Sequence, residues 1–334
     1  MNPLRPVLFH AGLLAIGGLA ATLAWSKEKT PQGARESNVT VWNVRPTDVQ
    51  KVVYEAKGKK LTLESRDEKK GERWFFGSAE RDGWAPPAPD GGVAAPAPKI
   101  VTIFSSSAPA TKVIEAFAPL KAVRSLGKIP EAQAAEYGFD KKETSVTVTI
   151  GGKDKKLVVG STAPGGTDTY VIDPASTEAY VLKADGIRDL ESGESRLMEH
   201  DQHAWKDYDV VSAKVSAGGK TRELVRGGPD GTKAWADPAS KDKADETAGN
   251  WMQKIDKLRV NEYVAEPPKG NTSVVRVDYT GSSGPLGFIE LVKVPGADGQ
   301  KADYWFVTER THLYGKVMQQ SGEQAEQDVA SVVK

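Results

Sequence analysis

The feature that most constrains the fold of this chain is a repeated segment. Residues 51–58 (KVVYEAKG) and 212–219 (SAKVSAGG) align without a gap, and Trp74 and Trp235 are separated by the same 161 positions. Self-similarity at a fixed offset is the signature of a module that a chain uses more than once. A chain of 334 residues has room for two or three domains, so we expect two copies of one module.

Hydrophobic periodicity predicts the same order of elements in both copies. Alternating apolar residues indicate strands, because successive side chains of a strand point to opposite faces. An amphipathic pattern predicts a helix over residues 110–124, and residues 120–124 align with residues 255–259 at an offset of 135. The strands that we expect after the helix are 145–150, 156–159, 169–172 and 179–182 in the first copy, and 273–279, 288–294, 304–308 and 313–317 in the second. This order favours an α+β module in which an antiparallel sheet packs on a helix.

The expected domain boundaries follow from these patterns. Residues 39–184 form the first repeat, and residues 77–98 within it are proline-rich and predict a long exposed loop. Residues 185–206 are a helical connector, and residues 207–334 form the second repeat, closed by a short helix at 322–333. Residues 1–38 precede the first repeat as a cytoplasmic tip, a membrane anchor and a tether.

Residues 6–25 are an uncharged apolar run about as long as the ~20 residues that a helix needs to cross a bilayer. A cleaved signal peptide is the alternative, but the run is longer than a typical signal core and lacks a good small-x-small cleavage site. We therefore expect an uncleaved, single-pass anchor in a bacterial inner membrane, with the C-terminal domain in the periplasm. Ala11, Ala15, Gly18 and Thr22 recur at helical spacing and would let a second transmembrane helix approach closely.

Composition and motifs favour binding over catalysis. Lys+Arg and Asp+Glu are both 45, so no net charge attracts nucleic acid, and the chain has no Cys for thiolate chemistry. The Gly-rich stretch at residues 160–166 lacks the Gly-Lys-Ser/Thr ending of a phosphate loop, and the chain has no Gly-x-Ser-x-Gly elbow. We expect no catalytic residue and no cofactor.

Two pairs of residues are weak candidates for a site. His200 and His203 could share a helical face and bind a metal, although a zinc site needs at least one more protein ligand. A polar helix end in the connector is the alternative that we favour. Trp84 and Trp205 lie outside the obvious core patterns and are candidate partner contacts, with local packing as the alternative.

The order of short motifs in the first copy resembles an uncharacterised family of unknown function. The motifs are the Tyr-Gly-Phe-Asp turn at residues 137–140, the strand at 145–150, the Gly-terminated strand at 157–160 and Thr-Tyr-Val at 169–171. The resemblance spans about residues 48–317. The chain departs from the family pattern with Phe139 in place of Leu, with no Pro after the turn, and with the proline-rich insertion.

The resemblance implies a partner but no catalytic residue. Members of that family have one N-terminal transmembrane helix and are encoded beside ABC-2 transporters that resemble the gliding-motility GldF/GldG system. We therefore expect a non-enzymatic extracytoplasmic subunit that binds or scaffolds within an ABC transporter-like or motility/envelope complex, with a permease, an ATPase or other envelope proteins as partners. The alternative is a periplasmic carbohydrate-binding or hydrolytic envelope protein that uses the cleft between the repeats.

Overall fold

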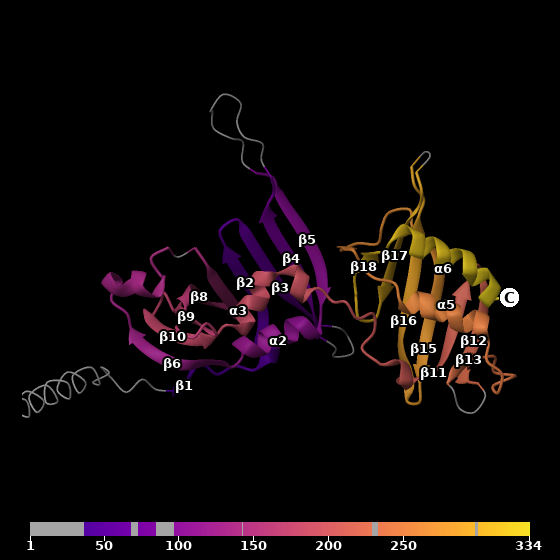
Figure 1. The fold of residues 1–334 in the computed structure, drawn as a ribbon, viewed down its shortest axis with the longest axis horizontal. Coiled ribbons are helices and arrows are strands. Elements are labelled where there is room, and N and C mark those ends of the chain that lie inside the picture. The colour runs from indigo at the N-terminus through magenta and orange to yellow at the C-terminus, as the bar shows by residue number, and fades with distance from the viewer. Residues whose placement is uncertain (1–36, 68–72, 85–96, 142, 229–232, 298–299) are drawn as a thin grey trace, which may run out of the picture.

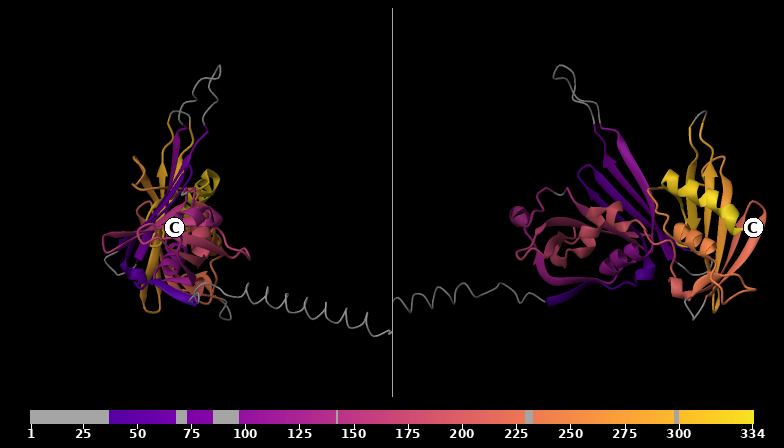
Figure 2. Two further views of the ribbon diagram at one scale, coloured as in Figure 1. Left: turned by 90° about the vertical axis from the view of Figure 1, so that its left-hand side faces the viewer. Right: turned by 45° about the vertical axis from the view of Figure 1, so that its right-hand side comes forward.

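The computed structural model describes residues 37–67, 73–84, 97–141, 143–228, 233–297 and 300–334. These residues form two large antiparallel sheets with helices, a mixed α+β fold made mostly of strands (Figure 1). We call residues 37–197 the first unit, 198–206 the connector and 207–334 the second unit. Figure 2 shows the two units side by side along the long axis of the described part of the chain.

Within the described residues, the first sheet has ten strands and the second has eight. The strands of the first sheet are β1 (Ser37–Trp42), β2 (Val49–Ala56), β3 (Lys59–Asp67), β4 (Arg73–Asp82), β5 (Lys99–Ser106), β6 (Leu120–Lys128), β7 (Ser145–Ile150), β8 (Lys153–Thr162), β9 (Asp168–Ile172) and β10 (Glu178–Lys183). Those of the second sheet are β11 (Val210–Ala217), β12 (Lys220–Gly227), β13 (Ala234–Ala236), β14 (Glu262–Val264), β15 (Thr272–Gly281), β16 (Gly284–Val294), β17 (Asp303–Thr308) and β18 (Tyr314–Lys316).

The helices stand between and after these strands. They are α2 (Ala108–Phe117), α3 (Asp185–Ser192), α4 (Glu194–Leu197), α5 (Glu246–Asp256) and α6 (Gln319–Val332), with 3-10 turns η1 (Pro46–Asp48), η3 (Glu131–Tyr137) and η4 (Asp207–Asp209). In each unit two helices pack against each other, α2 with α3 and α5 with α6. Figure 1 shows both pairs on the face of the sheets that is turned toward the viewer.

The second sheet repeats the strand order of the first. The first sheet runs β6-β10-β9-β8-β7-β2-β3-β4 between its two outermost strands, and the second runs β14-β18-β17-β16-β15-β11-β12-β13. When β1 and β5 are left out and the other strands are numbered from the start of each unit, both sheets have the order 4-8-7-6-5-1-2-3. The first sheet differs by adding β1 at one edge and β5 at the other.

The pairing register repeats as well. Lys51 pairs with Glu64 in the first sheet and Ser212 pairs with Val225 in the second, so both partners are displaced by the 161 positions that separate Trp74 from Trp235. A register shift falls between Val49 and Lys51 where β2 pairs with β7, and its counterpart falls between Val210 and Ser212. The register of these hairpins follows the repeated sequence residue by residue.

Each sheet buries one face under its helix pair. Ile114 and Phe117 of α2 and Leu190 of α3 are buried against the first sheet, and Trp251 of α5 lies at the centre of the second core. Fully burying an apolar side chain of this size contributes roughly 1.5–3 kcal/mol. The Trp251 indole N–H donates to the Ala325 carbonyl of α6 at 3.0 Å, so α5 and α6 are held together by a hydrogen bond as well as by packing.

Several expected boundaries are wrong. The helix expected over residues 110–124 ends at Phe117, and residues 120–128 form β6 between β1 and β10. Pro119 explains the early end, since the residue before a proline avoids helical geometry. The alignment of residues 120–124 with 255–259 is therefore wrong, because residues 255 and 256 still belong to α5.

The proline-rich loop and the connector also differ from expectation. Residues 77–82, expected in the loop, complete β4, and β5 was not expected at all. The core of the proline-rich stretch, residues 85–96, lies outside the described residues. The helical connector expected over residues 185–206 is interrupted at Gly193, whose φ of 66° is left-handed, and the chain is extended from Met198.

Candidate functional site

The connector joins the two units through buried polar contacts. The Glu199 backbone N–H donates to the Ser105 carbonyl of β5 at 2.8 Å, and its carboxylate lies 3.1 Å from the Arg310 guanidinium in the second unit. The Tyr263 hydroxyl donates to the Glu199 carbonyl at 3.1 Å. Tyr263 and Leu313 belong to the second unit in sequence but are buried in the core of the first. Side chains of both units therefore share one core at the junction.

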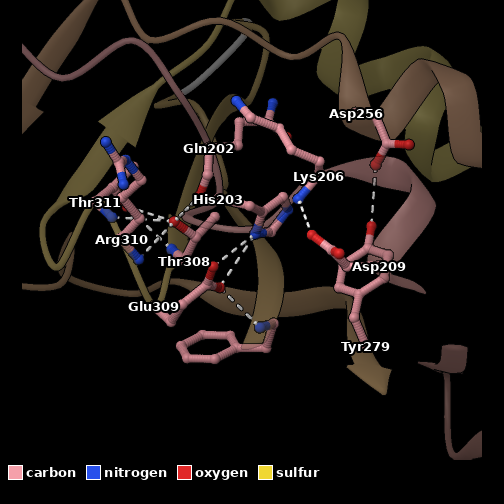
Figure 3. A network of polar contacts seen from close by, with 11 residues as sticks. Gln202, His203, Lys206, Asp209, Asp256, Tyr279, Thr308, Glu309, Arg310 and Thr311 are labelled. Atoms are coloured by element: carbon pink, nitrogen blue, oxygen red, sulfur yellow. Dashed lines mark hydrogen bonds and ion pairs between the residues drawn. The ribbon is translucent and has the colours of Figure 1, made fainter. Parts of the chain in front are cut away.

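His203 is the centre of the network drawn in Figure 3. Its Nδ1 lies 2.9 Å from Glu309 Oε1, and Glu309 Oε2 accepts the Phe288 backbone N–H at 2.9 Å. The imidazole is stacked on Trp205, with ring centroids 4.1 Å apart, and meets Tyr279 edge-on. The His203 side chain is 9% exposed, so its ring is fixed in a buried position.

Local sequence explains how Glu309 reaches this position. It lies in the turn after β17, where the Thr308 and Thr311 hydroxyls each accept the backbone N–H of the other residue at 3.0 Å. Its carboxylate then lies over β16 at Gly287, where an added Cβ would approach the Glu309 carboxyl carbon to 2.2 Å. Gly287 thus provides the space that the Glu309 side chain occupies.

A polar pocket of about 770 Å³ opens beside this network, within the second unit. The pocket is lined by Asp207, Arg226, Lys233, Ala234, Trp235, Ala244, Asp245, Glu246, Gly249, Asn250, Gln253 and Asp256. Two of these residues, Asp207 and Asp256 at the end of α5, also line a smaller neighbouring pocket of about 230 Å³, which includes His203 and Trp205. Acidic, basic and amide side chains lie together in this pocket.

Arg226 and Asp256 are the constrained charged groups of the pocket. The Arg226 guanidinium lies 4.0 Å above the centre of the Trp235 ring, donates to the Lys233 carbonyl at 3.1 Å and forms an ion pair with Asp207. The Tyr279 hydroxyl donates to Asp256 at 3.0 Å. Burial raises the pKa of the Asp256 carboxyl, against a smaller lowering effect of the Tyr279 hydrogen bond. Asp256 therefore takes up a proton more readily than an ordinary carboxyl group.

The two candidate metal ligands are placed differently. His203 is buried with Glu309, whereas His200, three residues earlier in the chain, is exposed. In the described part of the chain, no group of three or more His, Asp or Glu side chains has an arrangement that could hold a metal ion. The segment is also extended, so the shared helical face on which the pairing of His200 and His203 depended is absent.

The two candidate tryptophans have opposite environments. Trp205 packs on His203 and Tyr279 and is partly buried against the second core. Trp84 follows the end of β4 and is 77% exposed.

The membrane helix expected at residues 6–25, with its packing residues Ala11, Ala15, Gly18 and Thr22, lies outside the described residues. Among the helices that the structure does describe, none is both long enough and apolar enough to span a bilayer.

The motifs behind the family resemblance form one structural contact. Phe139 is buried at 2% exposure, and the Ser161 hydroxyl donates to the Tyr137 carbonyl at 3.1 Å. An added Cβ at Gly160 would meet the Tyr137 carbonyl oxygen at 2.2 Å, and Gly138 has a left-handed φ of 76°. The Tyr-Gly-Phe-Asp turn and the Gly-terminated strand are therefore required to pack on each other, and the contact carries no reactive group.

The fold and these contacts define an α+β protein with two antiparallel sheets and a polar pocket in the second unit. Residues 108–275 match a family described as Domain of unknown function (DUF4340), and the chain belongs to this family. No curated protein and no solved structure matches the chain.

Several residues of this site were not expected from the sequence. Glu309, Asp256, Arg226 and Tyr279 come from four separate segments and carry no shared motif. The local signal that was available is Asp245, three residues before Ala248 and ahead of an amphipathic stretch, which is the pattern of a helix N-cap. That signal locates the start of α5 but not the pocket beside it.

Proposed function

We propose that this protein is a non-enzymatic, membrane-anchored subunit that binds and positions other proteins in an extracytoplasmic complex. The observation that carries the proposal is the junction, where a buried ion pair and two core residues of the second unit tie both sheets into one body. A rigid junction of this kind holds two binding surfaces at a fixed spacing, which is what a scaffold requires. A protein that needed hinge motion between its units would gain from a looser, more solvent-exposed junction.

We further infer that the two units arose by duplication of one module. The common strand order and the common offset of register support this. The added strands β1 and β5 then distinguish the copies. Because they lie at the sheet edges, where another chain can pair, the copies present different surfaces to partners.

The location and partners of the complex rest on the sequence. The apolar run at residues 6–25 supports a single-pass anchor in a bacterial inner membrane with the two units in the periplasm. The family resemblance supports an ABC-2 transporter of the gliding-motility type, or another envelope complex, as the assembly that contains the protein. In this arrangement the anchor contacts the permease and the two units contact extracytoplasmic components.

Purification of the tagged full-length chain from native membranes tests the proposal. We expect detergent extracts to yield a permease, an ATPase or envelope proteins in a stable ratio to the chain. An unrelated single-pass protein with the same tag serves as the control for nonspecific capture. Recovery of the chain alone, or its release from membranes by alkaline carbonate, would contradict the proposal.

Carbohydrate binding is the second candidate, and the pocket beside Asp256 favours it. Carboxylates, an arginine and the exposed amides of Asn250 and Gln253 provide hydrogen-bonding partners for hydroxyl groups. This pocket lies within the second unit, whereas the alternative drawn from the sequence placed the ligand between the repeats. Saturable binding of a sugar to the full chain, weakened when Asp256 is replaced, would favour this candidate over pure scaffolding.

A further inference from the structure

The outer edge of β5 is a sheet edge that is only partly covered. β5 is the last strand of the first sheet and pairs on one side with β4, in an uninterrupted register from Lys99 to Ser106. On its other side, the connector makes one backbone hydrogen bond, from the Glu199 N–H to the Ser105 carbonyl, and β14 of the second unit lies close to β5 without pairing with it. Among the described residues, no hydrogen bond reaches the outer side of Val101 or Ile103.

The contact at Ser105 fixes which backbone groups of β5 face outward. In an antiparallel pair, the N–H and C=O of one residue point to the same side, and successive residues alternate. Because the Ser105 carbonyl points away from β4 toward Glu199, the backbone groups of Ile103 and Val101 point outward as well. These unpaired donors and acceptors are spaced as the next strand of the sheet would need them.

The side chains around this edge do not protect it. Ile100 and Val101 are 43% and 58% exposed, and Trp84 lies exposed near the same end of the β4–β5 hairpin. Charged side chains, lysine above all, usually guard an open edge. Lys99 is instead held over β4, with its amine 2.7 Å from Asp82 and 3.4 Å from Glu80. An exposed edge with apolar side chains and a neutralised lysine is suited to strand pairing.

We propose that residues 99–103 of β5 bind an extended segment of a partner polypeptide, which adds to the first sheet as a further strand. The proposal rests on the proposed scaffolding function and names its contact surface. The added strand continues the edge from the point where Glu199 already pairs with Ser105, and it places an apolar side chain against Val101. Backbone hydrogen bonds supply affinity, and the exposed Val101 and Ile100 supply selectivity for apolar residues.

The orientation of the edge favours a single strand over a second copy of the protein. Figure 1 shows the outer side of β5 turned toward the second unit, and the hairpin pointing away from the end of the first unit at which β1 begins. A whole sheet that approached this edge would meet the second unit, whereas one extended segment is narrow. β5 and β1 also lie at opposite edges of the ten-stranded sheet (Figure 1).

Val101→Pro tests the proposal in the full-length chain. Proline removes the N–H of residue 101, which points outward, so the pairing with β4 is kept while the added strand loses a hydrogen bond and meets the ring. Val101→Thr, which keeps both the N–H and the branched shape, is the matched control. We expect the partners recovered with the wild-type chain to fall roughly tenfold or more with Val101→Pro and to stay with Val101→Thr.

Hydrogen exchange in the purified complex provides a readout that does not depend on the variant. The amides of Val101 and Ile103 should exchange rapidly in the free chain and roughly tenfold or more slowly in the complex. Equal exchange in both states, or full partner recovery with Val101→Pro, would overturn the strand addition and leave the scaffolding function standing. A wild-type dimer that Val101→Pro dissociates would show that a second copy supplies the strand. Failure of the wild-type chain to recover any partner would overturn both proposals.

Discussion

At the scale of single residues, Asp245 and Asp256 show how one pocket shifts the pKa of two carboxyl groups in opposite directions. Burial raises the pKa of both groups, and for Asp256 burial dominates, so its pKa is raised. For Asp245 the Ala248 N–H at 2.9 Å and the Arg222 guanidinium at 2.7 Å outweigh burial, and its pKa is lowered. Ionised Asp256 therefore costs stability at neutral pH, whereas ionised Asp245 contributes to it.

The pH dependence of two substitutions follows. Asp256→Asn removes a carboxylate whose ionised form costs stability, so the variant should be more stable than the wild type at neutral pH. The gain should disappear as the pH falls below the ordinary Asp value of 3.8, where the group is protonated in both states. Asp245→Asn should be less stable at neutral pH, with a loss that shrinks on acidification. Urea unfolding of both variants, from neutral pH to below the ordinary Asp value of 3.8, measures this. A change of stability in the same direction for both variants would contradict the assignment.

At the scale of elements, the helix pairs depend on how closely each helix approaches its sheet. Gly322 of α6 lies against Tyr304 of β17, where an added Cβ would come within 2.2 Å of the ring. A Cβ added at Gly249 of α5 would have no atom within 4 Å. The two glycines are both inside helices, so the difference between them is tertiary packing alone.

Alanine at the two positions should have opposite effects. Gly249→Ala should stabilise the protein by about 0.5–1 kcal/mol, because alanine loses less backbone entropy in a helix. Gly322→Ala has the same advantage in backbone entropy, but its methyl group forces α6 away from Tyr304. Overpacking of this kind costs about 1–3 kcal/mol. Denaturant unfolding of the two variants compares them directly, and stabilisation by Gly322→Ala would show that α6 does not dock on β17 as described.

At the scale of the whole molecule, the junction couples the two units. Glu199 and Arg310 are 4% and 15% exposed, and their ion pair lies beside Tyr263, which is buried in the core of the first unit. A buried pair contributes little relative to apolar packing, but removal of one partner leaves an unpaired buried charge. A substitution that destabilises the second unit at this junction should therefore destabilise the first unit as well.

Arg310→Met should destabilise the protein by about 3–5 kcal/mol, and the double variant Glu199→Gln/Arg310→Met should recover a large part of the loss. Lys254→Met, which breaks the exposed pair with Asp328, is the control and should cost less than about 1 kcal/mol. Hydrogen exchange across the sheet of the first unit reports the transmission. Faster exchange confined to the second unit would show that the units are independent.

Many of the strands were accessible from the sequence, whereas β5 was not expected and the start of β6 was assigned to a helix. Their signals are local, since alternation of apolar residues and turn residues act within a few positions of each other. The strands at residues 145–150, 169–172 and 179–182 lie within one residue of their predicted bounds. The end of α2 was missed although Pro119 marks it, because the apolar spacing of residues 113–123 fits both a helix and a helix followed by a strand.

The amino-acid sequence by itself determined the mixed α+β class and the similarity of residues 51–58 to 212–219, because each is encoded in short-range patterns of side chains. Only the tertiary structure decided that Glu199 meets Arg310, that Asp256 lies beside Arg226, and that the outer edge of β5 is only partly covered. Those contacts join residues far apart in the chain, and their energies depend on burial and geometry that exist after the two sheets have packed.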